Sequence, residues 1–214
     1  MENTSQNTKP ILRGHFHQAM FFISLGALIP LIFRTHIFIE FVAIFVYSIC
    51  ALMMFGISTL YHRVTWSTER RLLWKKLDHA GIYLMIAGSF TPIALLALKS
   101  SSAQMLLSII WTVAAVGILQ SVFFVNVPKY VSSIIYLIAG YLIVPYMGEL
   151  KIALGLGNIA FIFLGGMAYS VGAICYALKW PQLSPKYFGY HEVFHIFVHL
   201  GAIFHFIVIQ GLIQ

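Results

Sequence analysis

Charged residues are rare in this sequence, and their rarity limits what the protein can be. Only 9% of the 214 residues are Asp, Glu, Lys or Arg, whereas 60% are hydrophobic and the mean hydropathy is +0.89. Soluble domains carry roughly 25% charged residues. The composition therefore excludes an ordinary soluble domain and indicates an integral membrane protein that acts in or at a bilayer.

Cysteine and acidic residues are scarce as well. Cys50 and Cys175 are the two cysteines, and both lie inside apolar runs, so no disulfide framework is expected. Asp78 is the only aspartate, and no Asp or Glu follows Glu192. The 13 basic residues exceed the 6 acidic ones, which gives a net charge of +7. In a membrane protein such an excess usually reports topology, so no nucleic-acid partner is expected.

We expect no cleavable signal peptide, because residues 1–18 are polar and no small-residue cleavage site follows the first apolar run. No internal repeat, low-complexity tract or soluble domain is evident. Two parts are predicted: a polar N-terminal segment of residues 1–17 and a seven-transmembrane domain of residues 18–214.

Long apolar runs are what the sequence has in abundance. A helix that spans a bilayer needs about 20 mainly apolar residues, and seven segments fit this description. They are approximately Gln18–Phe33, Ile37–Tyr61, His79–Leu98, Ala103–Phe124, Tyr130–Met147, Ile152–Leu178 and His191–Ile213. Gly140 and Pro145 predict a bend near the end of the fifth segment. The predicted fold is an all-α membrane protein, a seven-transmembrane helix bundle.

The basic residues predict how this bundle is oriented. If the N-terminus is cytoplasmic, ten of the 13 fall on the inside: Lys9, Arg13, Arg63, Arg70, Arg71, Lys75, Lys76, Lys129, Lys179 and Lys186. Only Arg34, Lys99 and Lys151 fall on the outside. This positive-inside bias predicts a cytoplasmic N-terminus and an external C-terminus in the cell (plasma) membrane.

The predicted loop Arg63–Leu77 carries the densest charge, with five basic residues among Trp66, Leu72, Leu73 and Trp74. We expect it to lie along the anionic inner leaflet as a topology anchor. The alternative is a docking role for a substrate or a partner.

The stretch His191-Glu192-Val193-Phe194-His195 opens the seventh segment and carries the first chemical signal. Histidines at i and i+4 lie on one face of a helix and can share a metal ion. Zinc accepts imidazole nitrogen, and H-E-x-x-H is a known zinc motif. In metalloproteases with this motif the Glu is the general base. That alternative also needs a third ligand, often an acidic residue further along, and none follows Glu192.

Topology brings more candidate ligands to the same membrane depth. The second segment ends at the cytoplasmic face with Ser58 and His62, the third begins there with Asp78, and the seventh begins there with His191 and His195. Ionisable groups inside spans are costly and therefore suggest function. Three neutral imidazoles leave a fourth zinc position open for water, as in catalytic sites. We predict His62, His191 and His195 as zinc ligands, although three imidazoles also suit other divalent metals.

Asp78 and Ser58 are the candidate catalytic residues. Beside a metal, Asp78 can accept a proton from bound water or orient a histidine. Ser58 lies four residues before His62 on the same helical face, where it can hydrogen-bond to Asp78 or to a substrate carbonyl.

The remaining histidines are weaker candidates. His79 points about 100° around the helix from the preceding aspartate, so we expect it at an interface. His199 continues the i+4 stripe one turn deeper, and His205 lies some 20 Å along the helix from His191. Either is expected to be a buried hydrogen-bonding residue. His15 and His17 flank the first segment and can approach the cluster, but nothing in the sequence fixes them there.

Three blocks of the sequence resemble the hemolysin III family: Ser58-x-x-x-His62, Asp78-x-x-Gly81-Ile82 and His191-x-x-x-His195. The surrounding stretches Gly56–His62, Leu77–Pro92 and His191–Phe206 also read like that family, which belongs with the progestin and adipoQ receptors and is similar to the alkaline ceramidases. Many members carry an acidic residue and an Asn/Thr-His motif before the first span. Here that region reads Arg13-Gly14-His15-Phe16-His17, so the role of that motif is not carried over.

The resemblance implies a seven-helix bundle, zinc held by the three histidines with a bound water, and Asp78 and Ser58 lining the site. The wider superfamily is associated with hydrolysis of lipid amides, and its bacterial members with membrane-lipid homeostasis or haemolysis. The leading hypothesis is a zinc-dependent hydrolase of a lipid amide or ester whose partners are membrane lipids. The alternatives are a non-enzymatic sensor with structural zinc, and a cytolytic protein, although no span presents the polar stripe of a pore.

Overall fold

Seven α-helices and one short 3-10 helix make up the part of the chain that the structure, a computed structural model, describes: residues 10–184 and 186–213. They are α1 (His15–Phe33), α2 (Phe38–Arg63), α3 (Thr68–Ala97), α4 (Ser100–Phe123), α5 (Lys129–Tyr141), η1 (Val144–Tyr146), α6 (Met147–Leu178) and α7 (Tyr190–Gln210). No β-strand occurs in these residues, which confirms the all-α fold class.

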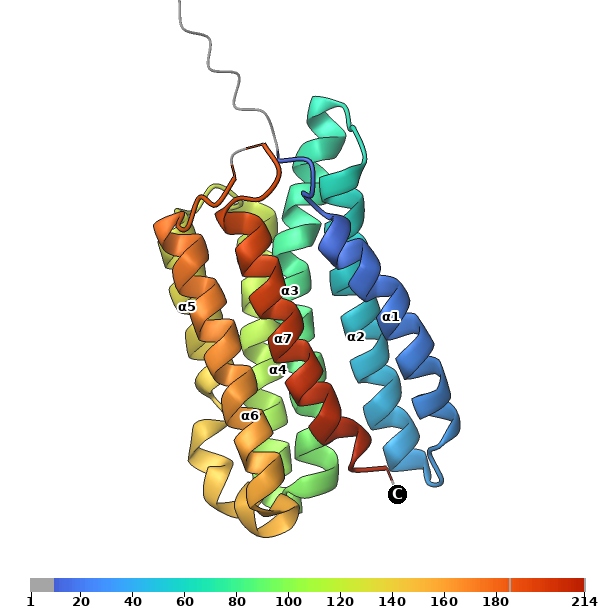
Figure 1. Ribbon diagram of the computed structural model, residues 1–214. Coiled ribbons are helices and arrows are strands. Elements are labelled where there is room, and N and C mark those ends of the chain that lie inside the picture. The colour runs from blue at the N-terminus through green and yellow to red at the C-terminus, as the bar shows by residue number, and fades with distance from the viewer. Residues whose placement is uncertain (1–9, 185, 214) are drawn as a thin grey trace, which may run out of the picture.

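The helices stand roughly side by side and run alternately up and down (Figure 1). α2 packs between α1 and α3, α4 packs on α3, α6 packs between α5 and α7, and α7 also contacts α1 and α3. Short connections explain this order, because consecutive helices joined by a few residues become antiparallel neighbours. One end of the bundle therefore collects the first turns of α1, α3, α5 and α7 and the last turns of α2, α4 and α6. We call it the site end.

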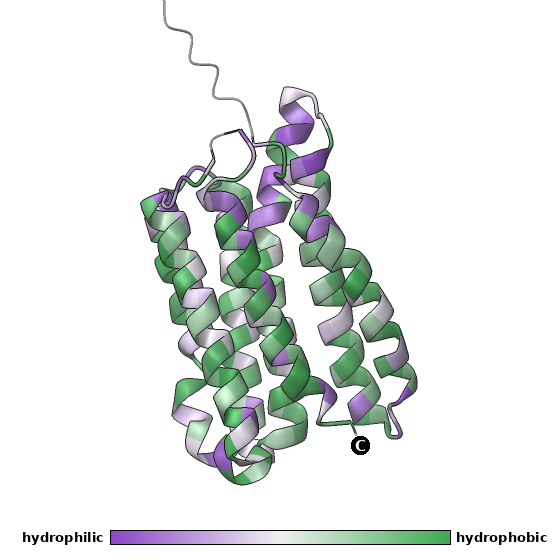
Figure 2. Ribbon diagram, in the orientation of Figure 1, coloured by the Kyte–Doolittle hydropathy of each residue, from purple (hydrophilic) through white to green (hydrophobic). Residues whose placement is uncertain are grey.

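The helices are mostly hydrophobic along their length, and the hydrophilic residues gather toward their ends (Figure 2). Large side chains such as Phe22, Phe123 and Ile152 are 61%, 74% and 89% exposed, which a protein surface in water would not favour. Six helical stretches of the described residues are long and apolar enough to cross a membrane. The chain is thus a multi-pass membrane protein.

The stretch Lys129–Leu178 counts as one of these six, although it folds back on itself. α5 has 13 residues, about 20 Å of helix at 1.5 Å per residue. That is shorter than a hydrocarbon core of roughly 30 Å, so the crossing of the fifth segment stays a prediction. The bend expected near Pro145 is present, because η1 separates α5 from α6. α6 begins at Met147, and a second break occurs inside it at Gly155, where φ is +76°.

The predicted loop between the second and third segments is wrong over most of its length. α3 begins at Thr68, so only residues 64–67 connect it to α2. Hydropathy placed the boundary where the charge begins, but Glu, Arg, Lys and Leu are all good helix formers. The charged stretch therefore continues the helix by almost three turns beyond the apolar part. Trp66 and Trp74 stack across the resulting turn with ring centroids 5.0 Å apart.

α2 and α3 approach each other closely, which aligns the polar ends of both helices. A Cβ atom on Gly88 of α3 would lie 2.4 Å from Cβ of Cys50 in α2. Only a residue without a side chain fits between these backbones. The close packing brings the last turn of α2 beside the second and third turns of α3.

Candidate metal site at one end of the bundle

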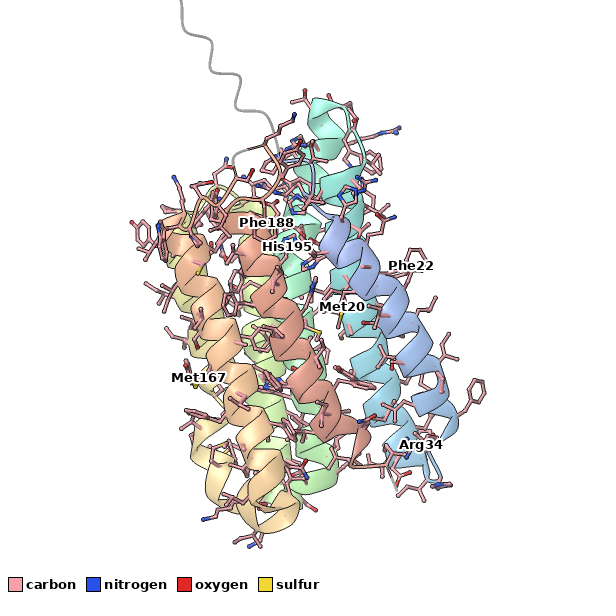
Figure 3. The ribbon with its side chains drawn as sticks, in the orientation of Figure 1. Met20, Phe22, Arg34, Met167, Phe188 and His195 are labelled. Atoms are coloured by element: carbon pink, nitrogen blue, oxygen red, sulfur yellow. The ribbon has the colours of Figure 1, made fainter. Side chains whose placement is uncertain are left out.

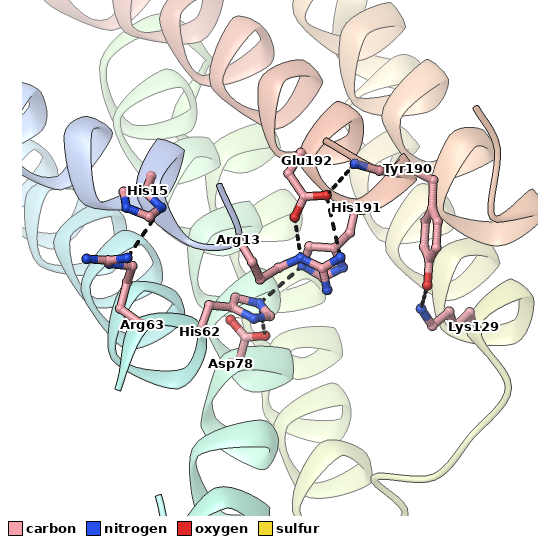
Figure 4. Close-up of polar contacts among 10 residues, drawn as sticks. Arg13, His15, His62, Arg63, Asp78, Lys129, Tyr190, His191 and Glu192 are labelled. Atoms are coloured by element: carbon pink, nitrogen blue, oxygen red, sulfur yellow. Dashed lines mark hydrogen bonds and ion pairs between the residues drawn. The ribbon is translucent and has the colours of Figure 1, made fainter. Parts of the chain in front are cut away.

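Three buried histidines from two helices meet at the site end. His62 lies in the last turn of α2, and His191 and His195 lie one turn apart at the start of α7. They are 6%, 8% and 2% exposed, and one ligand nitrogen from each lies within 4.8 Å of the others. The Nε2 atoms of His62 and His191 are 3.2 Å apart (Figure 4). The structure thus brings together the three residues that sequence topology placed at one depth.

The donor set fits a divalent metal ion. Three imidazoles with converging nitrogens are the protein ligands of many catalytic zinc sites, and they also suit other divalent metals. His195 supports this fit, because its buried Nδ1 has no hydrogen-bond partner among the described residues. An unpaired polar atom in a low-dielectric interior is costly. A cation shared by the cluster would also explain why two histidine nitrogens face each other.

Asp78 and Ser58 lie beside this cluster rather than within it. Oδ2 of Asp78 is 3.6 Å from Nε2 of His62, and Ser58 lines the same apolar cavity as Asp78. The Asp78 side chain is 15% exposed, whereas Ser58 is buried at 3%. A carboxylate in this place can receive a proton from a group bound at the histidines.

The contacts of Glu192 indicate a structural role rather than a catalytic one. Its carboxylate is completely buried, forms an ion pair with Arg13, and accepts a hydrogen bond of 2.8 Å from the Gly189 N–H. The second contact closes the first turn of α7, as a capping carboxylate does. Both oxygens are therefore occupied by structural partners. This arrangement does not favour the metalloprotease alternative, in which Glu192 would be the general base.

Arg13 belongs to a segment whose position the sequence did not predict. We call residues 10–14 the N-terminal strap. Its Ile11 N–H donates to the Lys186 carbonyl over 3.0 Å, so it crosses the loop before α7. Gly14 adopts φ +85°, and a Cβ on it would lie 2.7 Å from Cβ of His62. The strap therefore covers the candidate site from the outside.

His17, which the sequence left unplaced, lies directly on the cluster. Its ring stacks on His195 with centroids 3.8 Å apart and an interplanar angle of 7°. Its Nδ1 is 2.6 Å from Nε2 of His199, so His199 is a hydrogen-bonding residue as expected, although it is half-buried rather than buried. His195 is labelled in Figure 3 at the end of α7 that faces α1. The i+4 stripe of α7 and the first turn of α1 thus form one layer of imidazoles.

The other histidines lie apart from the three ligands. His205 is buried deeper in the bundle, with Nε2 3.4 Å from the Ile162 carbonyl. His15 points to Arg63, with 3.4 Å between Nδ1 and Nη1. His79 is half-buried and lines the cavities described next.

Two cavities meet at the candidate site. The first, of about 940 Å³, has a wall of mixed polarity, and we call it the vestibule; its walls include His62, His191 and several Lys and Arg side chains. The second, of about 380 Å³, runs into the bundle among α2, α3, α5, α6 and α7 and is lined mainly by apolar side chains. Asp78, His79, Lys129, Tyr176 and His191 line both. The candidate site therefore lies between a chamber that is rich in charged side chains and an apolar one.

Comparison with known proteins adds an independent finding. Residues 5–206 match the family model described as haemolysin-III related. The chain is 32% identical over 163 residues to "Hemolysin-3 homolog" of Bacillus subtilis strain 168, an alignment that covers 76% of this chain and 73% of the relative. It is 35% identical over 161 residues to "Hemolysin-3" of Bacillus cereus, with 75% and 70% covered.

Proposed function

The chain belongs to the haemolysin-III related family, and we propose that it is a zinc-dependent hydrolase of a lipid amide or ester that serves membrane-lipid homeostasis in the plasma membrane. The observation that carries this proposal is the position of the three-histidine cluster, with Asp78 beside it, at the mouth of an apolar cavity. A pocket with apolar walls and a few convergent polar groups is typical of a site for an amphiphilic small molecule.

The residues divide the chemistry between them. His62, His191 and His195 would hold the zinc ion, which as a Lewis acid polarises a carbonyl and lowers the pKa of water. Asp78 would take the proton that the attacking water loses as the new C–O bond forms. It would then return that proton to the amine or alcohol that leaves as the C–N or C–O bond breaks. Ser58 would hold the Asp78 carboxylate in place.

The apolar cavity would receive the acyl chain. Its wall includes Met54, Met85, Phe90, Phe194 and Val198. Methionine is flexible and polarisable, so a wall that contains it adapts to chains of different shape. Burial of each methylene contributes about 0.8 kcal/mol, which favours lipids over short acyl groups.

We also propose that the site end faces the cytoplasm. The basic residues Arg13, Arg63, Lys75 and Lys129 lie on elements of this end, whereas Lys151 lies at the other. Lys9 lies outside the described residues. The asymmetry supports a site within the cytoplasmic leaflet, where membrane lipids are the available partners.

Turnover of a lipid amide by the purified protein tests the proposed chemistry. We expect Asp78→Asn to lower kcat by about 10²- to 10⁴-fold, the usual contribution of a general base, while the metal content stays unchanged. Ser58→Ala should lower turnover less. Wild-type turnover in Asp78→Asn would remove Asp78 from the mechanism, and no turnover of any lipid amide or ester by the wild type would contradict the hydrolase.

A second function is favoured by the separation of the ligands. His62 and His191 are 129 residues apart in sequence, so a metal would join the early and late parts of the bundle. In that case zinc is structural and the protein acts as a non-enzymatic homeostasis factor. Chelation would then lower the melting temperature sharply while no lipid is hydrolysed. The name of the relatives suggests a third reading, cytolysis, which leakage of dye from liposomes at a low protein-to-lipid ratio would test.

A further inference from the structure

The vestibule carries far more positive than negative charge. Five basic side chains line it, Arg13, Arg71, Lys75, Lys129 and Lys179, whereas Asp78 is the only carboxylate among the described residues of its wall. Glu192 already pairs with Arg13. No carboxylate of the described residues forms an ion pair with any of the other four. The vestibule thus holds several cations that lack an anionic partner.

The early start of α3 explains how these cations are arranged. Arg71, Lys75 and Asp78 are spaced i, i+4 and i+7, so one face of the extended helix turns all three toward the vestibule. Like charges at i and i+4 destabilise a helix. Asp78, three residues after Lys75, is the one opposite charge on this face, and an anionic ligand would offset the repulsion further.

Lys129 is held in place at the opposite wall. Its Nζ donates to the Tyr190 hydroxyl over 2.6 Å and lies 4.4 Å from the ring centre of Tyr176 (Figure 4). Lys75 donates to Oδ1 of Asn126 over 2.9 Å. An ordinary topology anchor extends its side chain freely toward water. These two ammonium groups are fixed instead by neutral partners that leave their charge available.

The general positive-inside bias does not account for this placement. Arg63, Arg70 and Lys186 also lie at the site end, but they are exposed and do not line the vestibule. They serve topology equally well from the outer surface. The half-buried positions of Lys75 and Lys129 need a further reason, because an ammonium group with only neutral partners is costly to bury.

We propose that the vestibule binds an anionic, phosphate-class headgroup of a lipid whose acyl chain enters the apolar cavity. The two cavities share Asp78, Lys129 and His191, so a lipid that lies across both places its polar linkage at the histidine cluster. Lysine is a frequent phosphate partner because its compact ammonium acts as a point charge. The inference rests on the proposed function in one respect: the lipid linkage that lies at the histidine cluster would be the bond that the hydrolase cleaves.

Binding of three probes to the purified protein in a neutral maltoside detergent tests this inference without any need for turnover. The probes are dodecyl phosphate, dodecylphosphocholine and inorganic phosphate, and the readout is the rise in melting temperature with probe concentration. We expect dodecyl phosphate to bind about tenfold more tightly than the other two, the effect of a charge-assisted contact. Lys75→Gln and Lys129→Gln should each remove most of that preference.

Matched variants keep the result specific. Lys129→Arg, which keeps the charge, should retain the preference, and Lys151→Gln at the opposite end of the bundle should bind as the wild type does. Equal affinity for dodecyl phosphate and dodecylphosphocholine, or equal weakening by Lys151→Gln, would overturn the inference. Equally tight binding of inorganic phosphate would also overturn it, because the acyl chain would then play no part.

The same experiment separates this inference from the hydrolase proposal. Hydrolysis of a lipid amide by a protein that shows no preference for the anionic probe contradicts the headgroup site and leaves the hydrolase standing. A clear preference in a protein that hydrolyses no lipid supports the headgroup site and contradicts the hydrolase.

Discussion

At the scale of the residue, the position of Glu192 decides between two interpretations of the H-E-x-x-H motif, in which this glutamate is either a general base or a structural residue. Its carboxylate is completely buried and its contacts are Arg13 and the Gly189 N–H. A general base of a metalloprotease would instead face the substrate. These contacts of Glu192 thus stabilise the start of α7 and hold the strap, and the proposed mechanism assigns the proton transfer to Asp78.

Replacement of Glu192 by Gln should therefore reduce stability without removing the metal. Loss of the charged partner leaves the half-buried Arg13 guanidinium unpaired, which costs about 2 kcal/mol. The melting temperature of the purified variant measures this effect, and Glu69→Gln, at an exposed position of α3, serves as the control. Loss of turnover in Glu192→Gln with unchanged stability would favour the protease mechanism.

The grouping of the five candidate site residues was predictable, whereas their neighbours from the N-terminus were not. Ser58, His62, Asp78, His191 and His195 stand near the ends of apolar runs that alternate in direction, so sequence spacing and topology suffice to group them. Arg13 and His17 lie 179 and 182 residues from their partners Glu192 and His199. No periodicity connects such distant positions.

At the scale of the element, the N-terminal strap depends on one glycine. Gly14 has φ +85°, and its missing side chain leaves room for His62. Gly14→Ala should lower the melting temperature and weaken metal retention. The left-handed backbone conformation alone costs about 1–2 kcal/mol with a side chain present, and the added methyl group collides with Cβ of His62.

Gly26→Ala in the middle of α1 provides the matched control. Nothing lies within 4 Å of a Cβ at that position, and Ala is favoured over Gly in a helix by about 1 kcal/mol. The control should be as stable as the wild type or slightly more so. If Gly14→Ala matches it in melting temperature and metal content, the strap does not support the site.

The boundaries of the helices show where sequence reasoning ends. Apolar runs located all seven helices because lipid requires apolar surface over a fixed length. Hydropathy missed the first three turns of α3, since polar residues also form helix outside the membrane. The residues that line the vestibule from α3 were therefore assigned to a loop, although they share one helical face.

At the scale of the whole molecule, the orientation in the membrane is open to direct test. In a background with Cys50→Ala and Cys175→Ala, a single cysteine is introduced at Ser67 or at Ser101, which are exposed at opposite ends of the bundle. A membrane-impermeant maleimide should label Ser101→Cys in intact cells and Ser67→Cys only after permeabilisation. The reverse pattern would place the candidate site on the outside.

The proposed site and the proposed chemistry both depend on a metal ion bound by the three histidines. Elemental analysis of the purified protein, together with X-ray absorption at the metal edge, should find one zinc ion per chain with three imidazole ligands. His62→Ala, His191→Ala and His195→Ala should each lose it, because removal of one of three protein ligands opens a second coordination position. His36→Ala, exposed at the other end of the bundle, should keep it. Full metal content in His195→Ala, or no metal in the wild type, would contradict the central claim.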